Sequence, residues 1–148
     1  MSDPGAAWSR IAAFVVAVDA SLGKWLVDAY RVGLTDYRAL VRLADASDSE
    51  LRVNDLAAQI GLNQSSVTRL ISRLEAKGLT RRDLCPDDAR GVYAVLTDEG
   101  RALVDAVRSP YAARVSELLR EVATQAPDAD AGQLARDVAQ ISDLLTAA

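Results

Sequence analysis

Apolar residues recur at the spacing of an α-helix through most of the chain, and two short segments after the middle have the length of β-strands. The first helical stretch follows Asp3 and Pro4, which suit an N-cap and a first helical position, and Gly33 is expected to end it. Its apolar residues are spaced alternately three and four positions apart: Trp8, Ile11, Val15, Val18, Leu22, Trp25 and Ala29. So narrow a seam is typical of a helix that pairs with another along its length, so residues 1–34 are expected to form an N-terminal dimerisation helix.

A second helix is expected from Thr35, which can cap it, to about Ala46. Its inner face carries four apolar side chains: Tyr37, Leu40, Val41 and Ala44. Residues 45–50 that follow are small or polar, and they predict a loop.

Two short helices joined by a tight turn are predicted next. The first is capped by Asn54 and ends near Ile60, Gly61 supplies the turn, and Asn63 caps the second helix. The second helix runs to Lys77, and four of its residues share a face that must be buried: Val67, Leu70, Ile71 and Leu74. Its remaining positions are expected to be exposed: Gln64, Ser65, Ser66, Thr68, Arg69, Ser72 and Arg73. This arrangement is a helix-turn-helix, which places its second helix in the major groove of DNA.

Gly78 is well placed as the C′ glycine of the second motif helix. Two strands are expected after it, at Thr80–Leu84 and Val92–Leu96, and the polar residues 85–91 join them. A strand pair that follows a helix-turn-helix forms a wing. The predicted fold class is therefore mainly α with a small β-wing, a winged helix-turn-helix with about six helices. Residues 35–97 are expected to be its DNA-binding region.

The remaining chain, residues 98–148, predicts two further helices. Thr97 can cap a long helix that contains Pro110, which should bend it. A last helix is expected from about Asp130, with an apolar seam: Leu134, Val138, Ile141 and Leu145. These C-terminal helices are expected to complete the dimerisation surface, in one integrated domain with the rest of the chain.

Composition excludes several classes of function. The chain has 148 residues, no histidine and one cysteine, so zinc sites, histidine acid–base catalysis and Cys-His or Ser-His triads are excluded. We therefore expect no enzyme, no metal and no cofactor. No run of 18 apolar residues and no signal peptide is visible, so neither a membrane span nor export is expected. A lone Cys85 also fits a reducing cytoplasm, which is the expected location.

The net charge of −4 is unusual for a DNA-binding protein, but the charge is unevenly distributed. Between Leu51 and Val95 there are seven basic and five acidic residues, a net +2, which leaves −6 for the rest of the chain. This polarity would orient the predicted helix-turn-helix toward DNA.

The exposed face of the second helix of the motif suits contact with DNA. Gln64, Ser65 and Ser66 lie in its first turn, where such helices touch base edges. Glutamine can bond adenine bidentately, arginine is the usual reader of guanine, and Ser or Thr hydroxyls can bond phosphates. The expected contacts of this helix are Asn63, Gln64, Ser65, Ser66, Thr68, Arg69 and Arg73. The same residues could also form an ordinary solvated helix face.

The predicted wing adds a further basic contact. Arg90 lies in the wing turn, where it can enter an adjacent minor groove, and Asp88 can brace its guanidinium. Both residues are included among the expected DNA contacts. Arg81 and Arg82, at the base of the wing, are either phosphate contacts or surface charge.

These motifs together resemble the MarR family of winged-helix regulators. The run LAAQIGLNQSSVTRLISRLEAKGLTRR is followed by Asp88-Ala89-Arg90 in the wing and by the sequence LTDEG at residues 96–100. The resemblance implies a homodimer built from the terminal helices, which binds palindromic operators and usually represses nearby genes. It also implies release by a small phenolic or carboxylate effector.

Three aromatic residues on the first two expected helices lie near where such an effector cleft would form: Trp25, Tyr30 and Tyr37. In a core rich in Ala and Val, aromatic residues more often serve for packing than for ligand binding. The chain departs from the family pattern at the wing turn. In the family this turn often begins Asp-Pro, whereas here it begins Cys85-Pro86. Oxidation of Cys85 could perturb the wing, or the residue could be a neutral replacement.

Two hypotheses remain for function. The first is a homodimeric DNA-binding transcriptional regulator, a repressor of palindromic operators. The second is a winged-helix interaction module that does not bind DNA, which the overall acidity favours. The polar face of the second motif helix and Arg90 favour the first.

Overall fold

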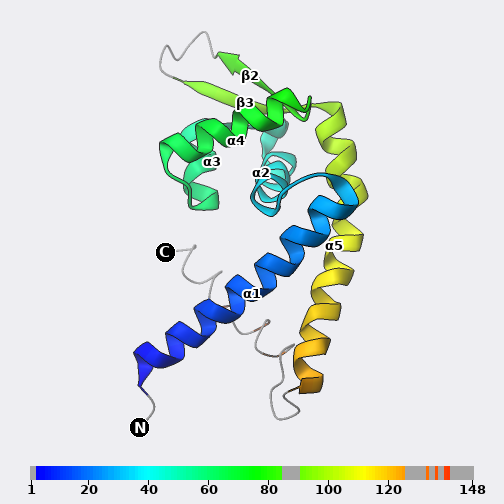
Figure 1. Cartoon of the computed structure of the whole chain (residues 1–148). Coiled ribbons are helices and arrows are strands. Elements are labelled where there is room, and N and C mark those ends of the chain that lie inside the picture. Colours follow the sequence, from blue (N-terminus) through cyan, green and yellow to red (C-terminus); the bar gives the residue numbers. More distant parts are fainter. Residues whose placement is uncertain (1–2, 85–90, 126–132, 134–135, 137–138, 141–148) are drawn as a thin grey trace. The chain divides into compact units, whose positions relative to one another are not determined.

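The computed structural model describes residues 3–84, 91–125, 133, 136 and 139–140, and the chain divides into two units, Met1–Arg108 and Ser109–Ala148. The described part contains five α-helices, a single 3₁₀ turn and three strands. They are α1 (Pro4–Tyr30), α2 (Leu34–Asp45), the 3₁₀ turn Ser47–Ser49, β1 (Glu50–Arg52), α3 (Val53–Ile60), α4 (Gln64–Ala76), β2 (Thr80–Leu84), β3 (Val92–Leu96) and α5 (Asp98–Gln125). The expected mainly helical fold with a small β-wing is confirmed (Figure 1).

The second unit contains the end of α5 from Ser109, and the helix continues through Pro110. Most of the last expected helix, from Asp130, lies outside the described residues. No helix in the described part of the chain is both long enough and apolar enough to cross a membrane.

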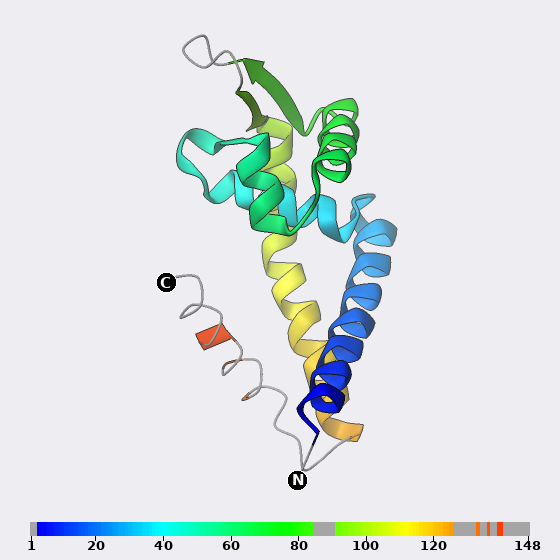
Figure 2. The same cartoon turned by 90° about the vertical axis from the view of Figure 1, so that its left-hand side faces the viewer.

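The wing is a three-stranded antiparallel sheet in the order β1-β3-β2. Figures 1 and 2 show the β2–β3 hairpin at one end of the first unit, beside α4. The expected loop at residues 45–50 is wrong at its end, because Glu50 already pairs with Val95 and starts β1. A strand of three residues is too short to show an alternation of apolar and polar residues. Its position depends on pairing with β3, which is distant in the sequence.

The core of the first unit is formed by leucine and valine side chains from every helix and from the sheet. The predicted buried face of α4 is confirmed, because Val67, Leu70, Ile71 and Leu74 have at most 1% of their surface exposed. Full burial of such a side chain contributes about 1.5–3 kcal/mol relative to exposure. Hydrophobic packing therefore fixes which face of α4 points outward.

Two of the predicted helix caps are wrong. Helix α1 ends at Tyr30 with a left-handed Arg31 (φ 58°), and Gly33 instead precedes α2, so Thr35 lies inside that helix. Helix α3 begins at Val53 directly after β1, so Asn54 is already helical and makes no cap. In both cases the helix begins one residue or more before the predicted cap, because the preceding backbone conformation is set by contacts that the local sequence does not predict.

Other predicted terminal features are confirmed. Gly61 and Gly78 have φ values of 70° and 73°, which side-chain-bearing residues rarely adopt. Thr97 caps α5, because its Oγ1 accepts a hydrogen bond from the Gly100 amide at 3.1 Å and donates one to the Gly78 carbonyl at 2.6 Å. These contacts join the end of α4 to the start of α5.

The predicted seam of α1 is buried at Leu22, half-buried at Val18 and Trp25, and exposed again at Ala29. Leu22 and Leu26 are core residues, whereas Trp8 is 69% exposed and Ile11 and Val15 are also exposed. Leu26 is not part of the predicted seam. Its burial was not predicted, because it depends on packing that the spacing of apolar residues alone does not determine. The N-terminal half of α1 therefore presents an apolar surface.

Candidate nucleic-acid interface

The N-terminus of α4 is capped as the sequence predicts. Asn63 Oδ1 accepts hydrogen bonds from the Ser66 amide and from Ser65 Oγ, both at 2.9 Å. This leaves Gln64 and Ser65 exposed in the first helical turn. Unpaired amide groups and the helix dipole make such a turn favourable for a phosphate.

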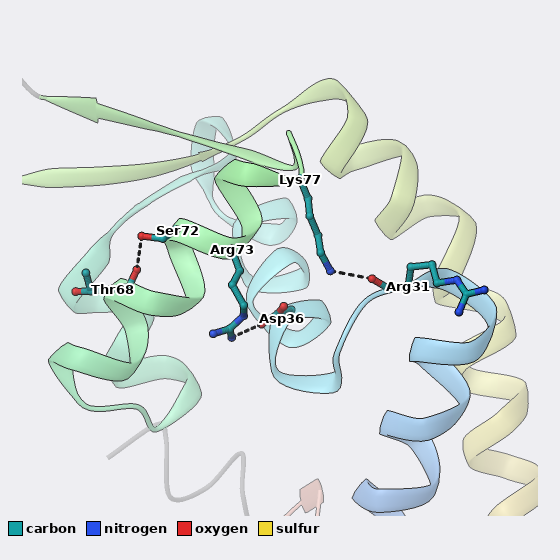
Figure 3. A network of polar contacts seen from close by, with 6 residues as sticks. All are labelled: Arg31, Asp36, Thr68, Ser72, Arg73 and Lys77. Carbon is teal, nitrogen blue, oxygen red and sulfur yellow. Dashed lines mark hydrogen bonds and ion pairs between the residues drawn. The ribbon is translucent and has the colours of Figure 1, made fainter.

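Two flanks of α4 carry different polar side chains. Thr68 and Ser72 lie on one flank, and Arg73 and Lys77 on the other (Figure 3). Thr68 Oγ1 donates to the Gln64 carbonyl at 2.8 Å, and Ser72 Oγ donates to the Thr68 carbonyl at 3.0 Å. The oxygens of both hydroxyls keep lone pairs that can accept hydrogen bonds.

The wing is joined to α4 by Arg82. Its NH2 group donates to Ser72 Oγ at 2.7 Å, and its Nε lies 3.3 Å from Glu75 Oε2. Arg81 instead pairs with Asp83 on its own strand at 3.4 Å. Of the two expected wing-base arginines, Arg82 is therefore the one that links the wing to the predicted recognition helix.

A hollow of about 360 Å³ lies where the start of α3, the first half of α4 and the wing strands meet. It is lined by Arg52, Val53, Asn54, Gln64, Thr68, Ile71, Arg82, Gly91 and Val92. None of these nine described residues is acidic, and two are arginines. The hollow is thus a depression with basic, polar and apolar walls beside the predicted DNA-contacting face of α4.

Arg52 is held at this hollow by Tyr93 of β3. Its Nε donates to Tyr93 Oη at 3.0 Å, and its guanidinium carbon lies 5.6 Å from the centre of the ring. Sequence reasoning missed Arg52 and Asn54 as site residues, because their place in the site follows from the pairing of β1 with β3. The one available signal was that Arg52 belongs to the basic segment between Leu51 and Val95.

Arg73 is directed away from the hollow. Its NH2 group lies 2.8 Å from Oδ1 of the buried Asp36 on α2. This hydrogen bond to Asp36 raises the pKa of Arg73 above its ordinary value. Lys77, one turn later, donates to the Arg31 carbonyl at 2.8 Å.

Of the remaining sequence candidates, the structure describes Arg69. Arg69 is exposed, and its Nε lies 3.4 Å from the Ser65 carbonyl. Asp88 and Arg90, like Cys85, lie outside the described residues, so their roles stay predictions.

The aromatic effector candidates separate into two groups. Trp25 and Tyr30 are half-buried and meet edge to face, with ring centres 5.5 Å apart and planes at 73°. Tyr37 is only 3% exposed and belongs to the core. Among the described residues, no group of three or more Cys, Asp or Glu side chains has an arrangement that could hold a metal ion.

Comparison with known proteins agrees with this geometry. The MarR family model matches residues 33–92. A relative, the HTH-type transcriptional regulator FarR of Neisseria gonorrhoeae, is 30% identical over 100 residues, which are 60% of this chain and 68% of FarR. The match to a Bacillus subtilis regulator, YdgJ, covers only 46% of that protein.

Two solved structures from Streptomyces coelicolor match nearly the whole chain. AbsC, a MarR family transcriptional regulator, is 26% identical with a TM-score of 0.77, and the match covers 100% of this chain and 98% of AbsC. Sco3205, a MarR family regulator solved in complex with DNA, is 26% identical with a TM-score of 0.76, covering 95% of this chain and 88% of Sco3205. The winged helix-turn-helix, its sequence and these relatives agree, and the chain belongs to the MarR family of transcriptional regulators.

Proposed function

We propose that this DNA-binding regulator acts as a homodimer that binds a palindromic operator and represses transcription from it. One observation carries the proposal. The exposed first turn of α4, with Gln64, borders a hollow whose described lining residues include two arginines and no carboxylate. A neutral hydrogen-bonding helix face beside a basic hollow suits a base edge and its adjoining phosphate.

The two parts of this surface would have separate tasks. Gln64 and Thr68 would lie at the major groove, where a glutamine amide can bond adenine bidentately. Arg52 and Arg82 would bind a backbone phosphate in the hollow, because guanidinium groups form charge-assisted hydrogen bonds with phosphate oxygens. Phosphate contacts fix the position of the protein, and base contacts determine the sequence that it prefers.

The wing tip would extend this contact. Arg90 is proposed to enter the flanking minor groove, with Asp88 as its brace. Support for this role comes from the sequence of the wing turn and from its place between β2 and β3.

Dimer formation is supported by the exposed apolar half of α1. Trp8, Ile11 and Val15 follow one another at coiled-coil spacing, and all are exposed. A second copy of the chain would bury this surface. Two recognition helices related by a two-fold axis would then read two half-sites about one DNA turn apart.

An effector is proposed to act near Trp25 and Tyr30. An edge-to-face aromatic pair that is half-buried can receive a planar phenolic ring or aryl carboxylate without opening the core. As a DNA-binding regulator, the protein is expected in the cytoplasm, with a binding role and no catalytic one.

Selection of bound duplexes from a random-sequence pool tests the proposal. A palindromic consensus with half-sites about 10 base pairs apart, centre to centre, would support a homodimer that reads DNA. Enrichment of an asymmetric site would contradict the palindrome. Absence of any enrichment would favour the interaction module instead.

A further inference from the structure

Two basic side chains, one near the end of α4 and one on its C-cap residue, turn toward the junction between α1 and α2 instead of toward the exposed face. Arg73 reaches the carboxylate of Asp36 at 2.8 Å, and Lys77 reaches the backbone carbonyl of Arg31 at 2.8 Å. Figure 3 shows both side chains pointing to the same side of α4, away from Thr68 and Ser72. They are four residues apart and Lys77 keeps a helical backbone as the C-cap of α4, so both side chains lie on one side of the helix and bind different parts of the junction.

Asp36 is the less exposed partner of the ion pair. Its side chain is 8% exposed, whereas that of Arg73 is 54% exposed. A buried carboxylate is unfavourable unless a cation and hydrogen bonds compensate it. Asp36 also lies in the first turn of α2, where the helix dipole favours a negative charge. The buried carboxylate therefore has a defined position, and the more exposed Arg73 side chain forms the ion pair with it.

The opposite flank of α4 is held as well. Arg82 of β2 binds Ser72 and Glu75 on that flank. Helix α4 is thus attached by charged hydrogen bonds to the sheet on one side and to α2 on the other. Its outer face, with Gln64, Thr68 and Arg69, makes no such bond to the sheet or to α2 among the described residues. This arrangement leaves the outer face available and restricts rotation of the helix about its axis.

We infer that Asp36 is a positioning residue for DNA recognition, which acts through Arg73 and sets the orientation of α4. This inference rests on the proposed DNA-binding function. Side-chain tips lie about 5–6 Å from a helix axis, so a rotation of about 10° moves them by about 1 Å. Hydrogen-bond distances tolerate only about 0.5 Å, so such a rotation would break a base contact made by Gln64.

The positioning role and a simple electrostatic effect predict opposite changes in operator affinity for Asp36→Asn. If Arg73 were a phosphate contact, Asp36→Asn would remove a negative charge near DNA, release the guanidinium and strengthen binding. If Asp36 positions α4, the same substitution weakens binding to the operator although the protein becomes less acidic. The sign of the change therefore separates the two roles.

The experiment compares the wild type with Asp36→Asn on the selected operator and on a random duplex, over a range of salt concentrations. Asp55→Asn is the matched control, because it removes an exposed carboxylate in the first turn of α3. We expect Asp36→Asn to lose at least tenfold in operator affinity, with random-duplex affinity and salt slope unchanged. The control should lose no operator affinity.

A double variant keeps the test decisive if Asp36→Asn alone does not fold. Asp36→Asn/Arg73→Gln replaces the ion pair by two amides that can still bond each other, and it should bind the operator within about threefold of wild type. A tenfold loss with a salt slope lower by about 0.9 per protomer would show a phosphate contact and overturn the inference. Operator binding by Asp36→Asn as tight as wild type would also overturn it. A wild type that binds no DNA would overturn both the inference and the proposed function.

Discussion

The hollow beside α4 gives the sharpest quantitative prediction, through the substitution Arg52→Ala. Each phosphate contact contributes about 0.9 to the slope of log affinity against log salt concentration. A homodimer would lose one contact in each protomer, so its slope should fall by about 1.8. Between 50 and 200 mM salt, the ratio of wild-type to variant affinity should therefore shrink by about twelvefold.

The loss of affinity at fixed salt follows from the lost hydrogen bonds. A hydrogen bond to a charged group contributes about 1.5 kcal/mol at the low end of its range, or about 3 kcal/mol for the dimer. This corresponds to roughly a hundredfold weaker binding. Because a phosphate contact is independent of sequence, operator and random duplexes should lose affinity in the same proportion.

A matched control separates this effect from damage to the fold. Arg52→Ala also removes the contacts with Tyr93, which contribute about 1–2 kcal/mol to stability. Tyr93→Phe removes the same hydrogen bond but keeps the cation, so it should retain the wild-type salt slope. Fluorescence anisotropy of a labelled duplex gives the slopes. An unchanged slope in Arg52→Ala would refute the assignment of the hollow to a phosphate.

Three further predictions concern other parts of the molecule. Gln64→Ala should change the preferred base at one position of each half-site and weaken operator binding more than random binding; equal losses on both duplexes would contradict a base contact. Gly100→Ala should lower the free energy of unfolding by about 1–3 kcal/mol in urea titrations, because the added Cβ would meet the Leu79 carbonyl and lie 2.6 Å from Leu96 Cδ1. Val15→Glu should convert a dimer to a monomer in sedimentation equilibrium with little loss of helix content, since Val15 is 48% exposed in the single chain. A variant that sediments as a dimer would place the interface elsewhere.

Much of the fold could be predicted because local signals and tertiary structure agree. The buried face of α4, the Asn63 cap and the glycines at 61 and 78 follow from helix periodicity and backbone sterics, which act over a few residues. Strand β1 and the start of α3 could not be predicted in the same way. Their position depends on pairing between Arg52 and Tyr93, which are 41 residues apart in the sequence.

The candidate site was predictable only on the outer face of α4. Exposure of Gln64, Thr68 and Arg69 follows from their helical positions relative to the buried face. The partners of charged side chains do not follow, because an arginine can reach in several directions from one helical position. Arg73 fits a DNA contact by spacing, yet its guanidinium binds Asp36, which precedes it by 37 residues.

The central claim is that the outer face of α4 recognises a specific DNA sequence. The most direct test is a salt-titrated binding curve of the wild-type protein on DNA from upstream of its own gene, compared with a random duplex of equal length. We predict steeply salt-dependent binding that is at least about a thousandfold tighter on the upstream DNA at physiological salt, which is the lower end of the range typical of specific recognition. Equal affinity for the two duplexes, together with failure to enrich any sequence from a random pool, would contradict it.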